Sequence, residues 1–252
     1  MRIGLIGAGN MASALARGWG EPVLVHDVDP IRAEALATSV GGEVVEGNAP
    51  LAERADAIVL CHKPAQLEQV AQEIGGAAKA VVSILGGTSL EAVESAYPDK
   101  PVYRFMPNIP AEVGRGVFCY APGAHAAEGP EEEILDRFGQ IGTVVRLPEP
   151  LIDVATALMG CGPAFFALVV EALVDAGVRR GLQPDQAALM TVETMAGTAE
   201  VLREHELDAA ALRRRVTSPG GSTARGLAAL ERGGVRAAFS NAVDAVVNAR
   251  PR

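Results

Sequence analysis

A glycine-rich turn within the first dozen residues constrains the fold of this chain more than any other feature. The apolar run Arg2–Ile6 leads directly into Gly7, Ala8, Gly9, Asn10, Met11 and Ala12, and a stretch with helical spacing follows. This is the G-x-G-x-x-G/A arrangement, in which the first glycine permits the tight turn and the second lets the backbone approach a pyrophosphate. The small third residue lets helix and strand pack closely. The sequence therefore predicts a dinucleotide site at the N-terminus of the first helix.

Asp27 ends the second apolar run and lies at the distance from the glycine turn that a ribose-binding acid requires. A carboxylate there accepts from the adenosine ribose hydroxyls and repels a 2′-phosphate, which favours NADH over NADPH. Two alternatives stay open. Asp27 caps the helix that starts at Asp29-Pro30-Ile31, or Arg32 pairs with a phosphate of NADPH.

Short apolar runs alternate with helical stretches through the first half of the chain, which predicts a parallel sheet covered on both faces. The expected strands are Arg2–Ile6, Val23–His26, Ala57–Leu60, Ala80–Ile84, Val102–Phe105, Val117–Tyr120 and Val144–Arg146. After about Pro148 only helical patterns remain, from Pro150–Gly160 to Val235–Asn248. We therefore expect an α/β Rossmann-type domain over residues 1–148 and an all-helical domain over residues 149–252.

Charge and cysteine content limit the partners and the compartment. The formal net charge of -9 disfavours nucleic acid and anionic membranes, because both bind basic surfaces. Three dispersed cysteines fit a reducing compartment and match no metal-ligand spacing. The run Val154–Val170 carries no charge, but Gly160, Gly162 and Pro163 interrupt it, which favours a buried core helix over a membrane span. A strand signal in the first residues leaves no room for a signal peptide, so a cytoplasmic protein is expected. Since no ligand cluster is present in the sequence, no metal is expected.

Four further segments resemble the pyrroline-5-carboxylate reductase family along essentially the whole chain. They are Leu60-Cys61-His62-Lys63-Pro64, Arg104-Phe105-Met106-Pro107-Asn108-Ile109-Pro110, Gly160-Cys161-Gly162-Pro163-Ala164-Phe165 and Thr217–Glu231. The last is the most specific, since Ser218-Pro219-Gly220-Gly221-Ser222-Thr223 is similar to that family's signature. The resemblance implies hydride transfer from NADPH or NADH to the C=N bond of 1-pyrroline-5-carboxylate, a cyclic imine carboxylate, giving L-proline.

The resemblance also implies a set of site residues. The cofactor would be bordered by Asn48, by Cys61, His62, Lys63 and Pro64, and by Met106, Pro107 and Asn108. The substrate would contact Ser218, Gly220, Gly221, Ser222, Thr223 and Glu149, with the Thr223 hydroxyl donating to the imine nitrogen as the catalytic group. Three of these expectations have plain structural alternatives: an ordinary helix capped by Ser218 or Thr223, a tight turn around Asn108, and a surface position for His62.

Met159, Cys161 and Phe165 depart from the family pattern, which usually has small hydroxyl residues at the first two positions and often Tyr at the third. A reductase of a different cyclic imine therefore stays open, as does a non-enzymatic sensor that binds the cofactor. A β-hydroxyacid dehydrogenase is disfavoured, because its helical domain needs a catalytic lysine and the lysines here are Lys63, Lys79 and Lys100. Long apolar helix faces predict a homodimer at minimum, and the family also builds larger rings of dimers.

Overall fold

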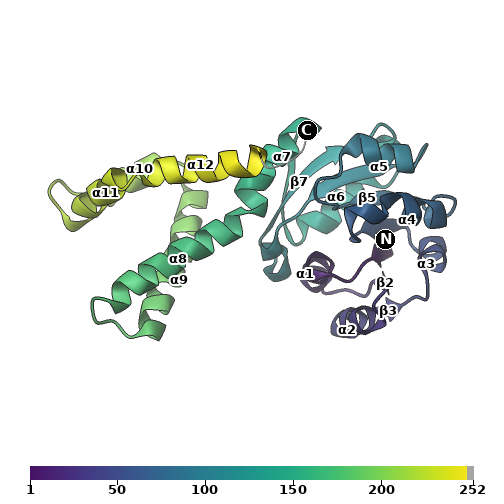
Figure 1. Cartoon of the computed structure of the whole chain (residues 1–252), viewed down its shortest axis with the longest axis horizontal. Coiled ribbons are helices and arrows are strands. Elements are labelled where there is room, and N and C mark those ends of the chain that lie inside the picture. Colours follow the sequence, from purple (N-terminus) through teal and green to yellow (C-terminus); the bar gives the residue numbers. More distant parts are fainter. Residues whose placement is uncertain (249–252) are drawn as a thin grey trace. The chain divides into compact units, whose positions relative to one another are not determined.

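The computed structural model describes residues 1–248 and divides into two compact units, Met1–Pro163 and Ala164–Arg252. The first unit is an eight-stranded sheet flanked by helices, and the second consists of helices and connecting loops (Figure 1). The predicted fold class, a Rossmann-type sheet domain followed by a helical domain, is confirmed.

The sheet has the strand order β3-β2-β1-β4-β5-β6-β7-β8. Its strands are β1 (Ile3–Ile6), β2 (Leu24–His26), β3 (Glu43–Val44), β4 (Ala57–Leu60), β5 (Val81–Ser83), β6 (Val102–Met106), β7 (Gly116–Pro122) and β8 (Gly142–Arg146). Strands β1 to β6 are parallel, β7 runs antiparallel to β6, and β8 is parallel to β7. In register, Ile6 lies opposite both His26 and Leu60, so the first parallel strands end together at one edge. Ligands of such sheets collect at this carboxyl edge.

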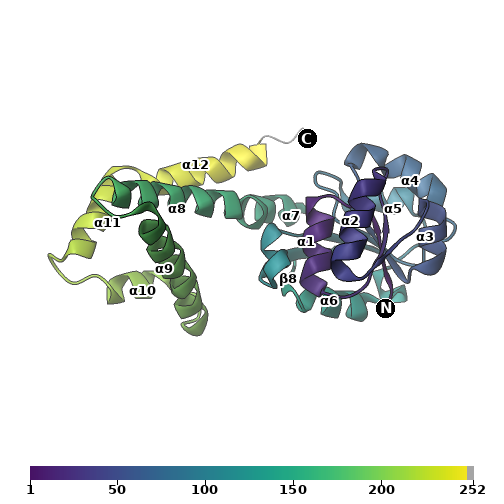
Figure 2. The same ribbon diagram turned by 90° about the horizontal axis from the view of Figure 1, so that it is seen from below.

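Helices cover both faces of the sheet, as its uniformly apolar strands require (Figures 1 and 2). One face packs on α1 (Asn10–Trp19), α2 (Pro30–Val40) and α6 (Glu131–Gly139), and the other on α3 (Asn48–Arg54), α4 (Leu67–Ile74) and α5 (Leu90–Ala96). Neighbouring residues of β1 point to opposite faces: Leu5 joins the first cluster and Ile6 the second. Because both faces are buried, the strands lack polar alternation.

Strand β3 and helix α3 were not expected from the sequence. Strand β3 is only two residues long and half-exposed, so no apolar run marks it. Helix α3 has Pro50 in its first turn and Gly47 before it, which together resemble a loop in the sequence.

Helix α7 (Glu149–Ala155) belongs to the first unit. Its Ile152 is fully buried and packs with Met106, Cys119 and Ala121 of the sheet. The boundary expected between residues 148 and 149 thus differs from the division at Pro163–Ala164, because α7 packs onto the sheet. The end of the expected second domain, residues 249–252, lies outside the described residues.

Helix α8 (Gly162–Val178) belongs to the second unit from Ala164 onward. The other helices of this unit are α9 (Pro184–Glu204), α10 (Ala209–Arg215), α11 (Ser222–Arg232) and α12 (Val235–Asn248). Among its described residues, 164–248, only Ala187 is buried. Large apolar side chains on α8 and α9 are exposed, including Phe166 at 59% and Leu189 at 63%. The helical stretch Glu149–Val178 is long and apolar enough to cross a membrane, with 11% of its most apolar window buried. The expected buried core over Val154–Val170 is therefore not formed within one chain.

Two helical glycines give opposite predictions for folding stability. A Cβ on Gly18 of α1 would lie 2.3 Å from the carbonyl oxygen of Ala111, whereas one on Gly139 of α6 would meet no atom. We expect Gly18→Ala to lower the free energy of unfolding by about 2 kcal/mol through overpacking. Gly139→Ala should raise it by up to about 1 kcal/mol, because alanine loses less backbone entropy on folding. Urea unfolding of both variants checks this, and equal effects would contradict the close approach of α1 to residue 111.

Candidate functional site

The turn between β1 and α1 requires glycine at its first position. Gly7 has φ +105°, and an added Cβ would lie 2.7 Å from both the carbonyl carbon and the carbonyl oxygen of Cys61. The Gly7 amide donates to the carbonyl of His26 at 2.7 Å. The turn is thus held against the ends of β2 and β4, at the carboxyl edge of the sheet.

Gly9 and the start of α1 form the part of this turn that faces open space. Gly9 is the N-cap of α1, and a Cβ added to it would meet no atom within 4 Å. No side chain caps the helix, so its first amides are left for another acceptor. Ala12 is buried and lets the helix pack closely on the sheet. These features fit the pyrophosphate of a dinucleotide, which needs free amides and no intervening side chain.

Asp27 supports the glycine turn directly. Its carboxylate accepts the Ala8 amide at 2.6 Å and the Asp29 amide at 2.8 Å. The alternative in which Asp27 caps α2 is wrong, because the side chain of Asp29 is the N-cap and accepts from Ile31 at 3.0 Å. Arg32 pairs with Asp29 at 3.3 Å on the surface. A carboxylate oxygen has room for a further donor, so Asp27 keeps the capacity to accept from a ribose hydroxyl.

Two buried acceptor atoms near this edge have no hydrogen-bond partner among the described residues. The Nδ2 group of Asn48 donates to Glu73 at 2.6 Å, while its Oδ1 is buried and unpartnered. His62 Nδ1 lies 2.9 Å from the carbonyl of Lys63, which can only accept, so Nδ1 carries the proton and the buried Nε2 is an unpartnered lone pair. Burial of the His62 ring lowers its pKa. His62 is half-buried, which differs from the surface position that the sequence left open. Unpartnered acceptors suit a ligand that brings hydroxyl donors, as a dinucleotide does.

The other residues of the Cys61–Pro64 segment have structural partners. Burial raises the pKa of the Cys61 thiol, which disfavours the reactive thiolate. The Lys63 amide donates to the side chain of Gln66 at 3.2 Å, and Pro64 begins a short 3-10 helix, Pro64–Gln66. The backbone of this segment therefore has a fixed course beside Gly7.

Met106, Pro107 and Asn108 close β6 at the same edge, and Met106 and Asn108 are both buried. Asn108 has an extended backbone and precedes the 3-10 helix Ile109–Val113, so the expected tight turn centred on it is not formed. Its Oδ1 accepts the Val117 amide at 2.8 Å, and its Nδ2 donates to the carbonyl of Met159 at 2.9 Å.

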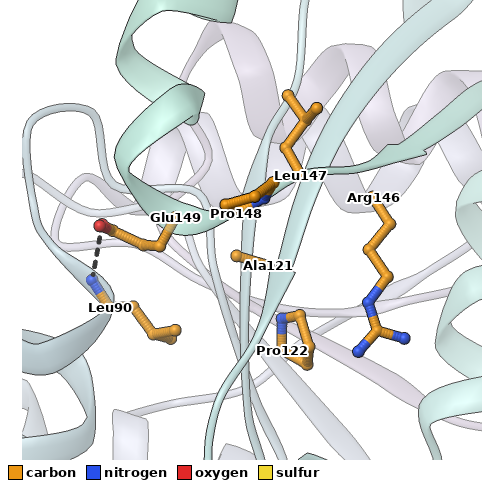
Figure 3. Close-up of a pocket in the computed structure, with 7 residues that line it drawn as sticks. All are labelled: Leu90, Ala121, Pro122, Arg146, Leu147, Pro148 and Glu149. Atoms are coloured by element: carbon orange, nitrogen blue, oxygen red, sulfur yellow. Dashed lines mark hydrogen bonds between the residues drawn. The ribbon is translucent and has the colours of Figure 1, made fainter.

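Glu149 lines a cavity of about 350 Å³ in the first unit, together with Leu90, Ala121, Pro122, Arg146, Leu147 and Pro148 (Figure 3). Its carboxylate accepts the Leu90 amide at 3.2 Å and pairs with Arg104 at 2.5 Å. In Figure 3 the carboxylate points toward Leu90, and the Arg146 guanidinium lies on the other side of Pro122. Protein groups thus already engage the Glu149 carboxylate that the sequence assigned to substrate.

The loop before α11 exposes an uncapped helix N-terminus in the second unit. Gly220 has φ +69°, and Gly221 is the N-cap, with its own amide donating to the Ser218 carbonyl at 3.1 Å. No side chain caps α11, so the alternative in which Ser218 or Thr223 acts as N-cap is wrong. Ser222 and Thr223 are exposed in the first turn. Free amides beside two hydroxyls can bind a carboxylate without a cationic side chain.

The structure brings Gly7–Ala12, Asp27 and the Cys61–Pro64 segment together, since hydrogen bonds and close contacts join the glycine turn to β2 and β4. The sequence did not reveal the role of Arg104, whose side chain is 3% exposed and binds Glu149 and Asp153. An arginine inside an apolar strand was the signal that could have indicated it. The two bonds of Asn108 were also missed, because its partners are distant in sequence.

Both parts of the chain are similar to known protein families. Residues 149–251 match the family described as pyrroline-5-carboxylate reductase dimerisation, and residues 2–87 match the NADP oxidoreductase family, coenzyme F420-dependent. The pyrroline-5-carboxylate reductase of Synechocystis sp. is 36% identical, covering 97% of this chain and 95% of the relative. That of Mycobacterium tuberculosis is 38% identical, covering 97% and 94%. A crystal structure of Plasmodium falciparum pyrroline carboxylate reductase with NADP bound superposes with a TM-score of 0.89 at 29% identity, covering 99% of this chain and 97% of that one.

Gly7 and Gly9 separate folding from dinucleotide binding. Gly9→Ala places a methyl group in open space, so we expect an unchanged melting temperature. The methyl group would occupy the space proposed for the pyrophosphate. We therefore expect the dissociation constant for the dinucleotide to rise about tenfold or more, which corresponds to a loss of about 1.4 kcal/mol of binding free energy. Gly7→Ala combines a positive φ with a backbone clash and should cost about 2–4 kcal/mol of stability. Calorimetry of unfolding and of binding measures both. Unchanged affinity in Gly9→Ala would show that the pyrophosphate lies elsewhere.

Proposed function

The chain belongs to the pyrroline-5-carboxylate reductase family, and from this premise we propose that it reduces 1-pyrroline-5-carboxylate to L-proline, the last step of proline biosynthesis. It is an oxidoreductase that uses a nicotinamide dinucleotide and acts on a C=N bond. The observation that carries the proposal is the presence, in one chain, of an open glycine turn at the sheet edge and an uncapped α11 N-terminus carrying Thr223.

The first unit holds the cofactor. The residues proposed to contact it are Gly7, Ala8, Gly9, Asn10, Met11, Ala12, Asp27, Asn48, Cys61, His62, Lys63, Pro64, Met106 and Pro107. When bound, the dihydronicotinamide supplies a hydride. Asp27, Asn48 and His62 all present acceptors, which suits the 2′- and 3′-hydroxyls of NADH better than a 2′-phosphate. We therefore propose NADH as the preferred reductant, with NADPH as the alternative that is common in the family.

The second unit binds the substrate carboxylate at the start of α11, through the amides of Gly221, Ser222 and Thr223 and the loop from Ser218 to Gly220. The Thr223 hydroxyl donates to the imine nitrogen, and this bond strengthens as the nitrogen gains electron density. The carbon of the C=N bond accepts the hydride, and the nitrogen takes up one proton to give the amine. Beyond the Thr223 hydrogen bond, the protein needs only to align the imine with the hydride donor and exclude water. No step requires a metal.

A different cyclic imine is the second candidate substrate, favoured by Met159, Cys161 and Phe165. Met159 packs partly buried against the small apolar cluster that contains Met106. The thioether and thiol at these positions remove hydroxyl donors. An assay with five- and six-membered imine carboxylates discriminates the two candidates.

The active form is proposed to be a cytoplasmic homodimer at minimum, with a ring of dimers as a larger assembly. The second unit supports a dimer, because its described residues form almost no buried core. Exposed apolar helix faces of this extent are usually buried against a partner chain. A matching dimerisation domain over residues 149–251 supports the same arrangement.

Replacing Thr223 tests the proposed reaction. Thr223→Ala should lower kcat/KM for 1-pyrroline-5-carboxylate about 100-fold, the effect of losing one hydrogen-bond donor to developing charge. Thr223→Ser keeps the hydroxyl and should stay close to wild type, as should Thr143→Ala on exposed strand β8. Oxidation of NADH and of NADPH, followed by absorbance, gives both the rates and the cofactor preference. Full activity in Thr223→Ala would remove this residue from the mechanism.

Substitution on α8 tests the assembly. Light scattering of the wild type should give at least twice the single-chain mass of 26.1 kDa. Phe166→Arg places a charge on an exposed apolar face and should shift the mass toward one chain, whereas Ile31→Arg, at a position 79% exposed on α2, should not. A wild-type mass near one chain would contradict the dimer.

A further inference from the structure

The regular backbone hydrogen bonding of the helix is interrupted where α7 passes into α8. Helix α7 continues into one π-helical turn, Thr156–Gly160, in which the Cys161 amide donates to the carbonyl of Thr156 at 3.0 Å. In an α-helix the carbonyl of Met159 would accept from residue 163, but residue 163 is proline and has no N–H. The sequence therefore deprives the Met159 carbonyl of its ordinary partner.

Asn108 supplies the missing donor from another part of the fold. Its Nδ2 lies 2.9 Å from the Met159 carbonyl, while its Oδ1 accepts the Val117 amide of β7 at 2.8 Å. The side chain is buried, the residue being 6% exposed, so both polar ends of the carboxamide are engaged inside the protein. One residue thus joins the end of β6, the start of β7 and the π turn.

Apolar packing reinforces the same connection. Met159 packs against the cluster of Met106, Cys119, Ala121 and Ile152. Met106 is the last residue of β6 and lies two residues before Asn108. Arg104, two residues further back, binds Glu149 and Asp153 of α7. The strand end proposed to border the cofactor and the Met159–Gly162 segment are therefore held as one packed element.

We propose that Asn108 is a positioning residue for hydride transfer, whose carboxamide holds the π turn at Met159 to the end of β6 and so fixes the segment Met159–Gly162 relative to the nicotinamide edge of the sheet. The inference rests on the proposed function, since it concerns the alignment of that reaction. In this proposal the Asn108 carboxamide acts through its hydrogen bonds to Met159 and Val117, and not by contacting the cofactor directly. It also explains the π turn, a feature that often marks functional sites.

Asn108→Asp is the first test, because it keeps the acceptor for Val117 and removes the donor to Met159. We expect kcat to fall about 10- to 100-fold, the effect of a small misplacement of reacting groups, while the dissociation constant of NADH stays near its wild-type value. The primary kinetic isotope effect measured with 4-deuterated NADH should become more dependent on temperature. Thr156→Val, which removes a hydrogen bond to Ile152 in the same turn without touching Asn108, is the matched control and should leave the isotope effect unchanged.

Pro163→Ala supplies a rescue. It restores an N–H four residues after Met159, so Asn108→Asp should reduce kcat much less in this background than in wild type. Equal losses in both backgrounds would overturn the inference, as would an NADH affinity that falls in parallel with kcat, which would indicate direct contact. A lower melting temperature with unchanged kcat would reduce Asn108 to a structural role and would also overturn it.

Hydrogen exchange separates this inference from the proposed function. In the protein without substrate, Asn108→Asp should speed exchange of the backbone amides in residues 156–164 and leave those of β6 unchanged. Unaltered exchange there would overturn the connection whether or not the wild type reduces an imine. Absence of imine reduction by the wild type, with the expected exchange, would overturn the proposed reaction and with it the role of Asn108 in hydride transfer.

Discussion

The carboxyl edge of the sheet depends on one close approach between backbone segments. Gly7 lies so near the carbonyl of Cys61 that no side chain fits, and its amide bonds to the end of β2. The turn into α1 is therefore fixed by three neighbouring strands, and the free amides of that helix face open space beyond Gly9. Asp27 strengthens the arrangement by accepting the Ala8 amide. The same few atoms shape the proposed dinucleotide-binding surface and hold the sheet edge together.

Strand β6 is the second organising element. Arg104 reaches from its buried middle to two carboxylates of α7, and Asn108 reaches from its end to the π turn that follows. The Arg104 guanidinium is buried while its two carboxylate partners are half-exposed, and these two ion pairs attach α7 to the middle of β6. Helix α7 and the π turn, both in the first unit, are consequently fixed to the strand that ends at the proposed nicotinamide site. The second unit, in contrast, has apolar faces without a core of their own.

Much of the fold followed from local sequence rules. The glycine turn, the seven expected strands and the helical second half all correspond to elements of the structure, because apolar runs and punctuating glycines mark them directly. Strand β3 and helix α3 escaped, being short and marked by turn residues. The partners of Asp27, Glu149 and Asn108 also escaped, because they are set by tertiary contacts between residues far apart in the chain. The motif residues were therefore foreseeable, but the atoms that they bind were not.

The proposed reaction transfers a hydride from a nicotinamide to the carbon of a cyclic C=N bond. The most direct measurement is mass spectrometry and NMR of the product formed from 1-pyrroline-5-carboxylate and NADH stereospecifically deuterated at C4. Direct hydride transfer gives L-proline carrying one deuterium at C5, and only one of the two C4 epimers delivers it. Unlabelled proline from both epimers, or no proline at all, would contradict it.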